Sequence, residues 1–528
     1  MRIKLIYPKV ERKGNVSEFR FLSRLLSPFT GDKQGASIMG AMPLALPTIA
    51  ALTPPDHEVI ITDENIEPID FDEAVDIVGI TFLAFSAYRA YEIATAFRKK
   101  GVHVVLGGIH ASMAPDEAQP YADTLFIGEV EDTWPEFIED FKNGAPRKTY
   151  RTRERPDLQK RVIPRWDLIR NRYYYTYHVQ TTRGCPFDCD FCCVREYLGR
   201  PRSKPIENVL AEIQAVRRYA RTGGVERIVF ADDNIFSNRE YAKELFKALI
   251  PLRIQWSSQC SLNIAKDDEV LDLARESGCQ SLLIGFESLS KESLQSVNKE
   301  KLNKVQEFEE IIDKIHSRKI NVAFMIVLGL DGDDETVFEK AAAFLKKKSV
   351  AYPVFNVLTP AVGTRLYSRL EQEGRLLHQR WVEYNGTTVC YKPKNMSVDT
   401  LQQGFYWILR DQYSLERILE RIETLWDQGI IRLENIPALT KLVLTIVFAL
   451  QLFKENGDMA RLLKRVIHMI WTKQGISIEV LLLNLSYLDF ARNLPVPTVD
   501  FSDRKKRVTP GRRKYRQEWA QPSQTVAG

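Results

Sequence analysis

The sequence has little cysteine, and its first 184 residues contain none. Only seven cysteines occur in 528 residues, and four of them fall between positions 185 and 193. An odd number of cysteines that are so unevenly distributed argues against a disulfide framework and favours a reducing compartment. We therefore expect a cytoplasmic protein whose cysteines serve chemistry rather than cross-linking.

Long apolar runs and a strong charge imbalance are also absent. No stretch of about 18 apolar residues occurs, so the sequence predicts no membrane-spanning helix. The start, MRIKLIYPKV, has no long apolar run, so we expect no signal peptide. A net charge of only +5 makes no general demand for a nucleic-acid partner, and 44% hydrophobic residues suffice for a sizeable core.

Two long segments alternate strands with helices. Residues 1–145 show buried strands separated by helical periods, which predicts a doubly wound, Rossmann-like α/β domain. Residues 146–170 are charged and without period, so we expect a linker there. Residues 171–385 resume the alternation over six strands, which predicts a partial (βα)6 barrel. Residues 386–495 are expected to be helical, and residues 496–528 form a basic tail.

Three cysteines carry the clearest chemical signal. Cys185, Cys189 and Cys192 form a C-x3-C-x2-C run within TTRGCPFDCDFC. Thiolates at this spacing can bind three irons of one [4Fe–4S] cluster, and the amino and carboxylate groups of S-adenosylmethionine (SAM) can chelate the fourth iron. The alternative is a zinc site, which usually needs four protein ligands. Cys193 directly follows Cys192 and fits poorly as that fourth ligand.

Polar motifs follow three of the predicted barrel strands. They read FADDN at residues 230–234, GFES at 285–288 and LGLDGDDE at 328–335. Carboxylates at the carboxyl ends of barrel strands suit an ammonium group or a pair of ribose hydroxyls. For Asp232 and Asp233, ordinary turn and helix-capping roles are an equal alternative.

With these motifs the chain resembles the radical SAM enzymes. The resemblance implies a [4Fe–4S] cluster on Cys185, Cys189 and Cys192, and SAM as a second cofactor. It implies SAM contacts for Phe191, Asp232, Asp233, Glu287, Gly329 and Asp331. Phe191 could equally be ordinary packing beside the cluster. No single catalytic residue is assigned.

The first domain resembles the cobalamin-binding domain that precedes many radical SAM enzymes. The segments VVLGGIHASMAPDEA and LFIGEVED carry this likeness. It implies cobalamin contacts for Thr81, Ser86, Gly107, Gly108, His110 and Gly128. The D-x-H-x-x-G motif that supplies a cobalt-binding histidine elsewhere is absent, so we expect no histidine ligand below the cobalt. His110 could instead be a structural loop histidine.

The order of the domains resembles cobalamin-dependent radical SAM methyltransferases, in particular hopanoid-methylase-like proteins. The resemblance implies cleavage of SAM to a 5′-deoxyadenosyl radical, hydrogen abstraction from an unactivated carbon and methyl transfer from cobalamin. It also implies an electron donor, either a reductase, a ferredoxin or a flavodoxin. The alternatives are a non-methylating radical SAM enzyme, such as an oxidative cyclase, and a non-catalytic cobalamin or iron–sulfur sensor. A transfer-RNA methylthiotransferase is disfavoured because residues 1–184 lack the second cysteine set of that class.

The C-terminal part suggests a hydrophobic substrate. Residues 442–453 and 478–490 are strongly apolar, and residues 504–516 read RKKRVTPGRRKYR. Together they predict a lipid or isoprenoid-like small molecule and peripheral contact with the inner face of the membrane. Buried core helices and a solvated tail are the alternative. Nucleic acid ranks last, because no recognised RNA-binding module accompanies the tail.

Overall fold

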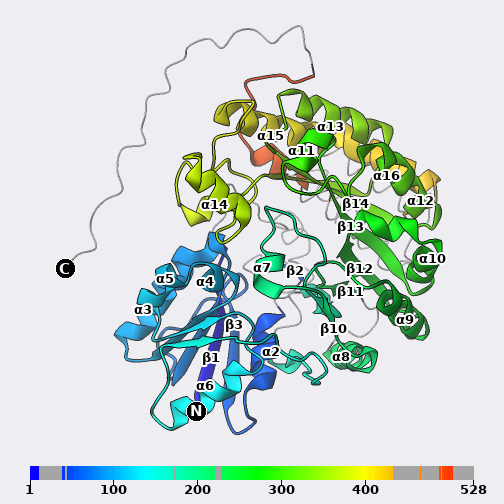
Figure 1. The fold of residues 1–528 in the computed structure, drawn as a ribbon. Helices are drawn as coiled ribbons and strands as arrows, with labels where there is room; N and C mark the ends of the chain where they lie inside the picture. The colour runs from blue at the N-terminus through cyan, green and yellow to red at the C-terminus, as the bar shows by residue number, and fades with distance from the viewer. Residues whose placement is uncertain are drawn as a thin grey trace.

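The computed structural model describes residues 1–10, 39–41, 44–169, 174–219, 227–431, 464, 484, 487–488 and 490–502. Two parallel sheets dominate it, one in the N-terminal α/β domain and one in the barrel (Figure 1). The apolar segment 442–453, most of 478–490 and the basic stretch 504–516 lie outside the described residues. Among the described residues no helix is both long enough and apolar enough to cross a bilayer.

The N-terminal sheet has six parallel strands in the order β3-β1-β4-β5-β6-β7. The strands are β1 (Arg2–Tyr7), β3 (Glu58–Asp63), β4 (Ile77–Thr81), β5 (His103–Gly107), β6 (Thr124–Ile127) and β7 (Thr149–Arg151). The helices around it are α2 (Ala45–Leu52), α3 (Ala87–Lys99), α4 (Ile109–Met113), α5 (Pro115–Ala118) and α6 (Thr133–Lys142). The chain changes direction across the sheet between β1 and β4, which confirms the doubly wound fold and places a ligand-binding edge at the strand carboxyl ends.

Strand β7 lies inside the segment that we expected to be a linker. It pairs with β6 in register from Leu125 to Ile127. Its central residue, Tyr150, is 1% exposed and stacks on Phe126 with ring centroids 5.2 Å apart. A single buried aromatic among charged neighbours gives no periodic signal, so the sequence did not predict this strand.

The second sheet is the partial barrel. Its strands run parallel in the order β15-β14-β13-β12-β11-β8-β2. The six expected strands are β8 (Tyr174–Val179), β11 (Arg227–Phe230), β12 (Gln255–Cys260), β13 (Cys279–Glu287), β14 (Asn321–Leu328) and β15 (Tyr352–Val357). The seventh, β2 (Met39–Ala41), comes from the N-terminal part of the chain and was not predicted.

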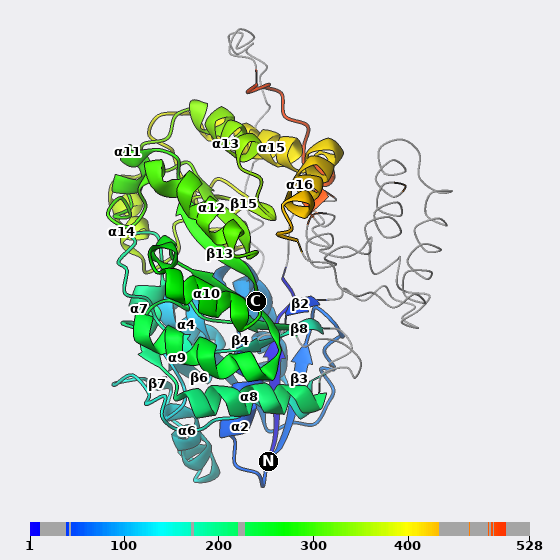
Figure 2. The same ribbon diagram turned by 90° about the vertical axis from the view of Figure 1, so that its right-hand side faces the viewer.

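Helices cover the outer face of the barrel sheet. They are α8 (Ile206–Tyr219), α9 (Arg239–Leu249), α10 (Asp268–Glu276), α12 (Phe308–Ser317) and α13 (Thr336–Lys347), and Figure 2 shows them one above another. Amphipathic sequences explain this arrangement, since α9 buries Ala242, Leu245, Phe246 and Leu249 on one face. The carboxyl ends of the strands remain available for a site.

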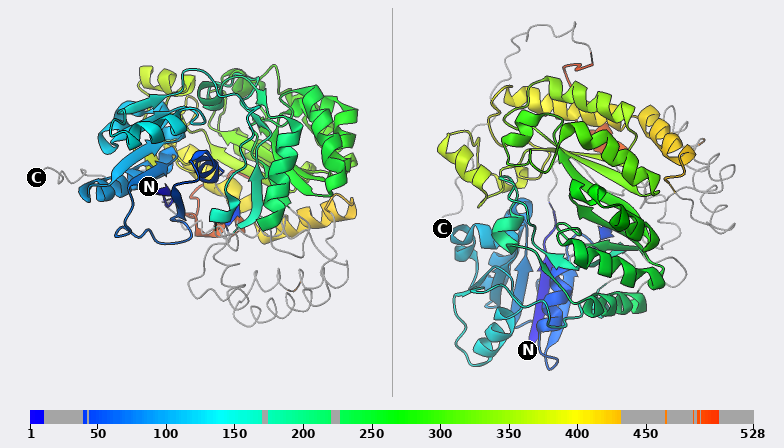
Figure 3. Two further views of the ribbon diagram at one scale, coloured as in Figure 1. Left: turned by 90° about the horizontal axis from the view of Figure 1, so that it is seen from below. Right: turned by 45° about the vertical axis from the view of Figure 1, so that its right-hand side comes forward.

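The C-terminal helices α15 (Val398–Gln412) and α16 (Leu415–Asp427) continue the core of the barrel. Gly404 of α15 lies against the ring of Phe338 on α13, where a Cβ would stand 2.0 Å from the ring. The helical C-terminal region is therefore packed on the barrel through a close helix contact. Figure 3 shows the N-terminal domain beside the barrel in both views.

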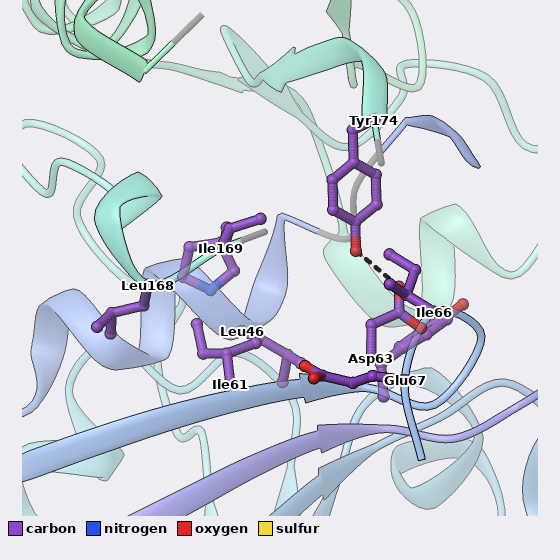
Figure 4. Close-up of a pocket in the computed structure, with 10 residues that line it drawn as sticks. Leu46, Ile61, Asp63, Ile66, Glu67, Leu168, Ile169 and Tyr174 are labelled. Atoms are coloured by element: carbon purple, nitrogen blue, oxygen red, sulfur yellow. Dashed lines mark hydrogen bonds between the residues drawn. The ribbon is translucent and has the colours of Figure 1, made fainter. Parts of the chain in front are cut away.

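A buried carboxylate joins the two sheets. The hydroxyl of Tyr174, the first residue of β8, donates to Asp63 at the end of β3 over 2.8 Å (Figure 4). Burial raises the pKa of Asp63, while hydrogen bonds from Asn65 and Tyr174 oppose that rise. The adjoining void measures about 20 Å³, which holds about one water molecule and no organic ligand.

Candidate active site

A cavity of about 370 Å³ opens at the carboxyl ends of the barrel strands. This volume lies within the usual range for small-molecule sites. Its walls come from the cysteine loop, from the ends of β11 to β15, and from a later segment that contributes Tyr384 and Gly386. The parallel strands explain why motifs far apart in the sequence meet here.

The cysteine loop is held at its base by a short ribbon. Strand β9 (Thr182–Arg183) pairs antiparallel with β10 (Arg202–Ser203), so residues 184–201 form a loop that includes α7 (Val194–Leu198). Gly184 has a φ of 87°, and a Cβ there would lie 2.6 Å from the carbonyl oxygen of Gly199. Only glycine fits this position, directly before Cys185.

The two aspartates of FADDN bracket the start of this loop. Asp232 accepts hydrogen bonds from the amides of Thr181 (2.7 Å) and Thr182 (3.1 Å), and from the Thr181 hydroxyl. Burial raises the pKa of Asp232 to about 6. Its oxygens are occupied and it does not line the cavity, so it holds the base of the cysteine loop, a role that is neither the expected SAM contact nor a local turn or helix cap. Asp233 accepts from the Gly184 amide over 3.1 Å and lines the cavity.

Cys185, Cys189 and Cys192 all line the cavity as free thiols. Burial raises the pKa of Cys189 to about 11 and that of Cys192 to about 12, so iron binding would have to release their protons. No three His, Cys, Asp or Glu side chains among the described residues converge as ligands of a single metal ion. A cubic cluster needs a wider arrangement, because each cysteine binds a different iron. Three thiols on one loop facing one cavity fit that requirement.

Cys193 differs from its three neighbours. It precedes α7 and is absent from the cavity wall. The geometry agrees with the expectation that it is no ligand.

A buried ion pair crosses the cavity wall. Lys299 Nζ pairs with Glu287 Oε1, and the two side chains are 12% and 9% exposed. Burial opposes the charge on Lys299, but Glu287 and the nearby Cys189 outweigh it and raise the Lys299 pKa. Among the described residues that line the cavity, Lys299 is the single cation. It was missed from the sequence, because no motif marks it.

The cavity offers polar groups that suit SAM. Asn234 lines it, and its buried Nδ2 has no hydrogen-bond partner among the described residues. Such an orphaned donor is available to a ligand oxygen or a water. Lys299 can meet a carboxylate, whereas Glu287 and Asp233 can meet ribose hydroxyls or an ammonium group. Phe191 also lines the cavity, with its ring centroid 5.8 Å from Lys299 Nζ.

Two expected SAM contacts lie elsewhere. The Gly329 amide donates to Asp333 over 3.0 Å, and Gly329 is absent from the cavity wall. Asp331 is turned towards Arg369 and Arg375, which hold its pKa at about 2 against the effect of burial. The structure therefore places Gly329 and Asp331 in a separate cluster, and their predicted SAM contacts have no support in this geometry.

The predicted cobalamin residues gather mostly at one edge of the N-terminal sheet. Thr81 and Gly107 pair at the ends of β4 and β5, and Gly108 and Gly128 follow β5 and β6 with φ values of 97° and 93°. All four are partly exposed, whereas the strand residues before them are buried. Small residues at three adjacent strand ends leave the backbone open to a flat ligand, which fits cobalamin.

The other two predicted cobalamin residues, Ser86 and His110, are buried. Ser86 is 2% exposed, and its hydroxyl donates to the Leu83 carbonyl over 3.2 Å. His110 is 1% exposed, and its Nε2 lies 3.5 Å from Glu117 Oε1. This environment matches the structural role that was the alternative for His110. The other described histidines of the domain, His57 and His103, begin or precede strands and so lie at the opposite edge.

Residues 381–384 connect the carboxyl-terminal edge of the N-terminal sheet to the barrel cavity. The 3-10 turn Trp381–Glu383 packs on the turn Ala84–Ser86 of the N-terminal domain, and Trp381 Nε1 donates to Glu117 over 2.6 Å. Tyr384, the next residue, lines the barrel cavity. Helix α4 meanwhile contacts α7, which follows the cysteines (Figure 1). The edge of the N-terminal sheet that carries the predicted cobalamin residues and the barrel cavity are therefore neighbours.

This combination of a cobalamin-type domain, a partial barrel and a three-cysteine loop defines a class of radical enzymes. The family model of the radical SAM superfamily matches residues 179–345, and that of the B12 binding domain matches residues 41–138. A domain of unknown function, DUF4070, matches residues 364–469.

Relatives narrow the class. The chain is 30% identical over 392 residues to bacteriochlorophyllide d C-12(1)-methyltransferase of Chlorobaculum tepidum, covering 72% of this chain and 85% of that one. It is 29% identical to hopanoid C-2 methylase of Rhodopseudomonas palustris, covering 64% and 65%. The fold matches the cobalamin-dependent radical enzyme OxsB with a TM-score of 0.60 at 12% identity, over 93% of this chain and 79% of OxsB.

The chain belongs to the cobalamin-dependent radical SAM methyltransferases. Its cofactors are a [4Fe–4S] cluster, SAM and cobalamin, and it needs an external electron donor. When bound, these groups supply the electron, the radical and the methyl group. The residues of this chain contribute the cavity, its apolar wall and the charged pair of Glu287 with Lys299.

Proposed function

We propose that the protein methylates an unactivated carbon of a hydrophobic, lipid or isoprenoid-like small molecule. The observation that carries the proposal is the apolar wall of the cavity. Strands β13, β14 and β15 supply most of it, with the lining residues Leu283, Met325, Val327, Val357 and Leu358. The charged lining residues are Asp233, which follows β11, and the pair of Glu287 with Lys299.

An apolar wall favours binding of a substrate whose surface is hydrocarbon rather than charged. Each buried CH₂ group contributes about 0.8 kcal/mol, so a few of them suffice for selection. The relatives support this class of substrate. They methylate a bacteriochlorophyllide and a hopanoid according to their names, and both of these molecules present extensive apolar surface.

The test uses protein reconstituted without oxygen, a strong one-electron reductant and SAM with a deuterated methyl group. Two probes are supplied separately, a pentacyclic triterpenoid and a chlorophyllide. We expect one of them to gain a labelled methyl group, detected by mass spectrometry, together with 5′-deoxyadenosine. Product that is oxidised but unmethylated would favour a cyclase-like reaction. Failure to label either probe would contradict the proposed substrate class.

Met325 provides a matched pair of variants. It lines the cavity and is partly exposed there. Met325→Gln keeps the size but adds a polar group, and we expect the KM for the probe to rise about tenfold. Met325→Leu keeps the wall apolar and should leave KM nearly unchanged. Equal KM values for both variants would remove the support that the apolar wall gives.

A further inference from the structure

A buried carboxylate joins the cobalamin edge to the cysteine loop. Glu129 directly follows Gly128 at the end of β6, and its side chain is 3% exposed. Its Oε1 lies 2.7 Å from Arg183 Nη1, and its Oε2 lies 2.6 Å from Arg202 Nη2. Both arginines belong to the ribbon of β9 and β10, in the barrel half of the molecule. One carboxylate of the first domain therefore holds both ends of the loop that carries the cysteines.

Arg183 is the closer of the two arginines to the cysteines. It stands two residues before Cys185, with its side chain 13% exposed, and it also pairs with Glu131 Oε1 at 2.5 Å. A charge pair at this burial is little screened by water or salt and fixes the geometry of its partners. The start of the cysteine loop therefore cannot shift without disturbing the segment 128–131.

Further contacts follow the same path. The hydroxyl of Tyr197 on α7 donates to the Gly128 carbonyl over 3.4 Å, and Arg155 donates to the Glu196 carbonyl over 3.2 Å. Arg155 Nη1 also approaches Glu129 Oε2 at 3.5 Å. Helix α7, which follows the last cysteine, is thus docked on the backbone of the glycine predicted to meet cobalamin.

We propose that Glu129 is a positioning residue that transmits cobalamin binding to the cysteine loop. A corrin that orders Gly128 orders Glu129 with it, and the two arginines carry that restraint to both ends of the loop. The cobalamin edge and the loop then keep one relative position, which methyl transfer between the two sites requires. The inference rests on the placement of cobalamin at the ends of β4, β5 and β6.

Hydrogen exchange of the full-length, cluster-free chain tests this directly. Peptides covering residues 181–193 are followed by mass spectrometry with and without hydroxocobalamin. In the wild type we expect cobalamin to slow their exchange about fivefold or more, the lower end of ordinary coupling between sites. Glu129→Gln should bind hydroxocobalamin with unchanged affinity but lose this protection. Glu129→Asp retains the charge and should restore part of it.

Two further variants make the result specific. Arg183 keeps Glu131 as a partner when Glu129 is neutralised, so Glu129→Gln should still fold. Arg202→Gln removes one of the two arginine contacts of Glu129 and should reduce the protection in part, because Arg183 still pairs with Glu129. Glu136→Gln removes an exposed ion pair with Arg147 in the same domain, and it should leave the protection intact.

The holoenzyme gives a second readout. Pulsed electron paramagnetic resonance between Co(II) and the reduced cluster should report a broader distance distribution in Glu129→Gln than in the wild type. Normal hydroxocobalamin binding without protection of residues 181–193, or full protection in Glu129→Gln, would overturn the proposal alone. Failure of the wild type to bind hydroxocobalamin would overturn the cobalamin placement and the proposal together.

Discussion

The pair of Glu287 with Lys299 allows a quantitative prediction. Its two side chains are only 9% and 12% exposed, so removing one partner leaves a nearly desolvated charge behind. Breaking a buried pair in this way typically costs about 3–5 kcal/mol. Lys299→Met should therefore destabilise the cofactor-free barrel by at least about 3 kcal/mol. At about 2–4 °C per kcal/mol for a domain of this size, its Tm should fall by about 6–12 °C.

The double variant separates charge from packing. Glu287→Gln with Lys299→Met removes both charges and should recover stability to within about 1 kcal/mol of the wild type, because no isolated charge remains. Lys301→Met is the control, since Lys301 is an exposed lysine two residues away. Thermal unfolding by intrinsic fluorescence measures all four proteins. A Tm for Lys299→Met within about 2 °C of wild type, or additive losses in the double variant, would refute the reasoning.

Three further predictions concern cobalt, pH and membranes. Electron paramagnetic resonance of the Co(II) form should show no superhyperfine splitting from a protein histidine nitrogen. The one described histidine near the carboxyl ends of the N-terminal strands, His110, is buried against Glu117. Observation of such splitting would contradict this prediction. Asp232 has its pKa raised from 3.8 to about 6, so the folded state holds its proton more tightly and stability falls as pH rises through that window. Asp232→Asn should therefore gain stability relative to wild type between those pH values in urea titrations, and a parallel pH dependence would disprove the assignment. The intact protein should bind anionic liposomes at low salt and lose binding when residues 504–528 are deleted, by about 1 kcal/mol per basic residue near the surface; no binding at low salt would count against membrane contact.

The sequence predicted the parallel strands because continuous apolar runs alternate with amphipathic helices. It missed β2 and β7, since each has only three residues, and β2 also pairs with β8, a strand far away in the chain. Tyr150 is buried by Phe126 and Phe137, and neither contact leaves a local pattern.

The sequence predicted the site residues that share one short motif, but it predicted less well those that tertiary packing brings together. Cys185, Cys189 and Cys192 share one loop, so their common cavity follows from local sequence. Asp331 follows β14 as the motif predicts. However, the chain turns at Gly329, whose φ is 93°, and the carboxylate of Asp331 pairs with Arg369 and Arg375. Lys299 lies twelve residues beyond Glu287, and only tertiary packing buries it against that carboxylate.

Cleavage of SAM by the reconstituted protein tests the central claim most directly. The measurement is 5′-deoxyadenosine released after reduction, in the absence of oxygen, by the wild type, Cys189→Ala and Cys193→Ala. Cys189 lines the cavity with Cys185 and Cys192, whereas Cys193 does not. The account predicts release by the wild type and by Cys193→Ala, and none by Cys189→Ala. Full release by Cys189→Ala would contradict it.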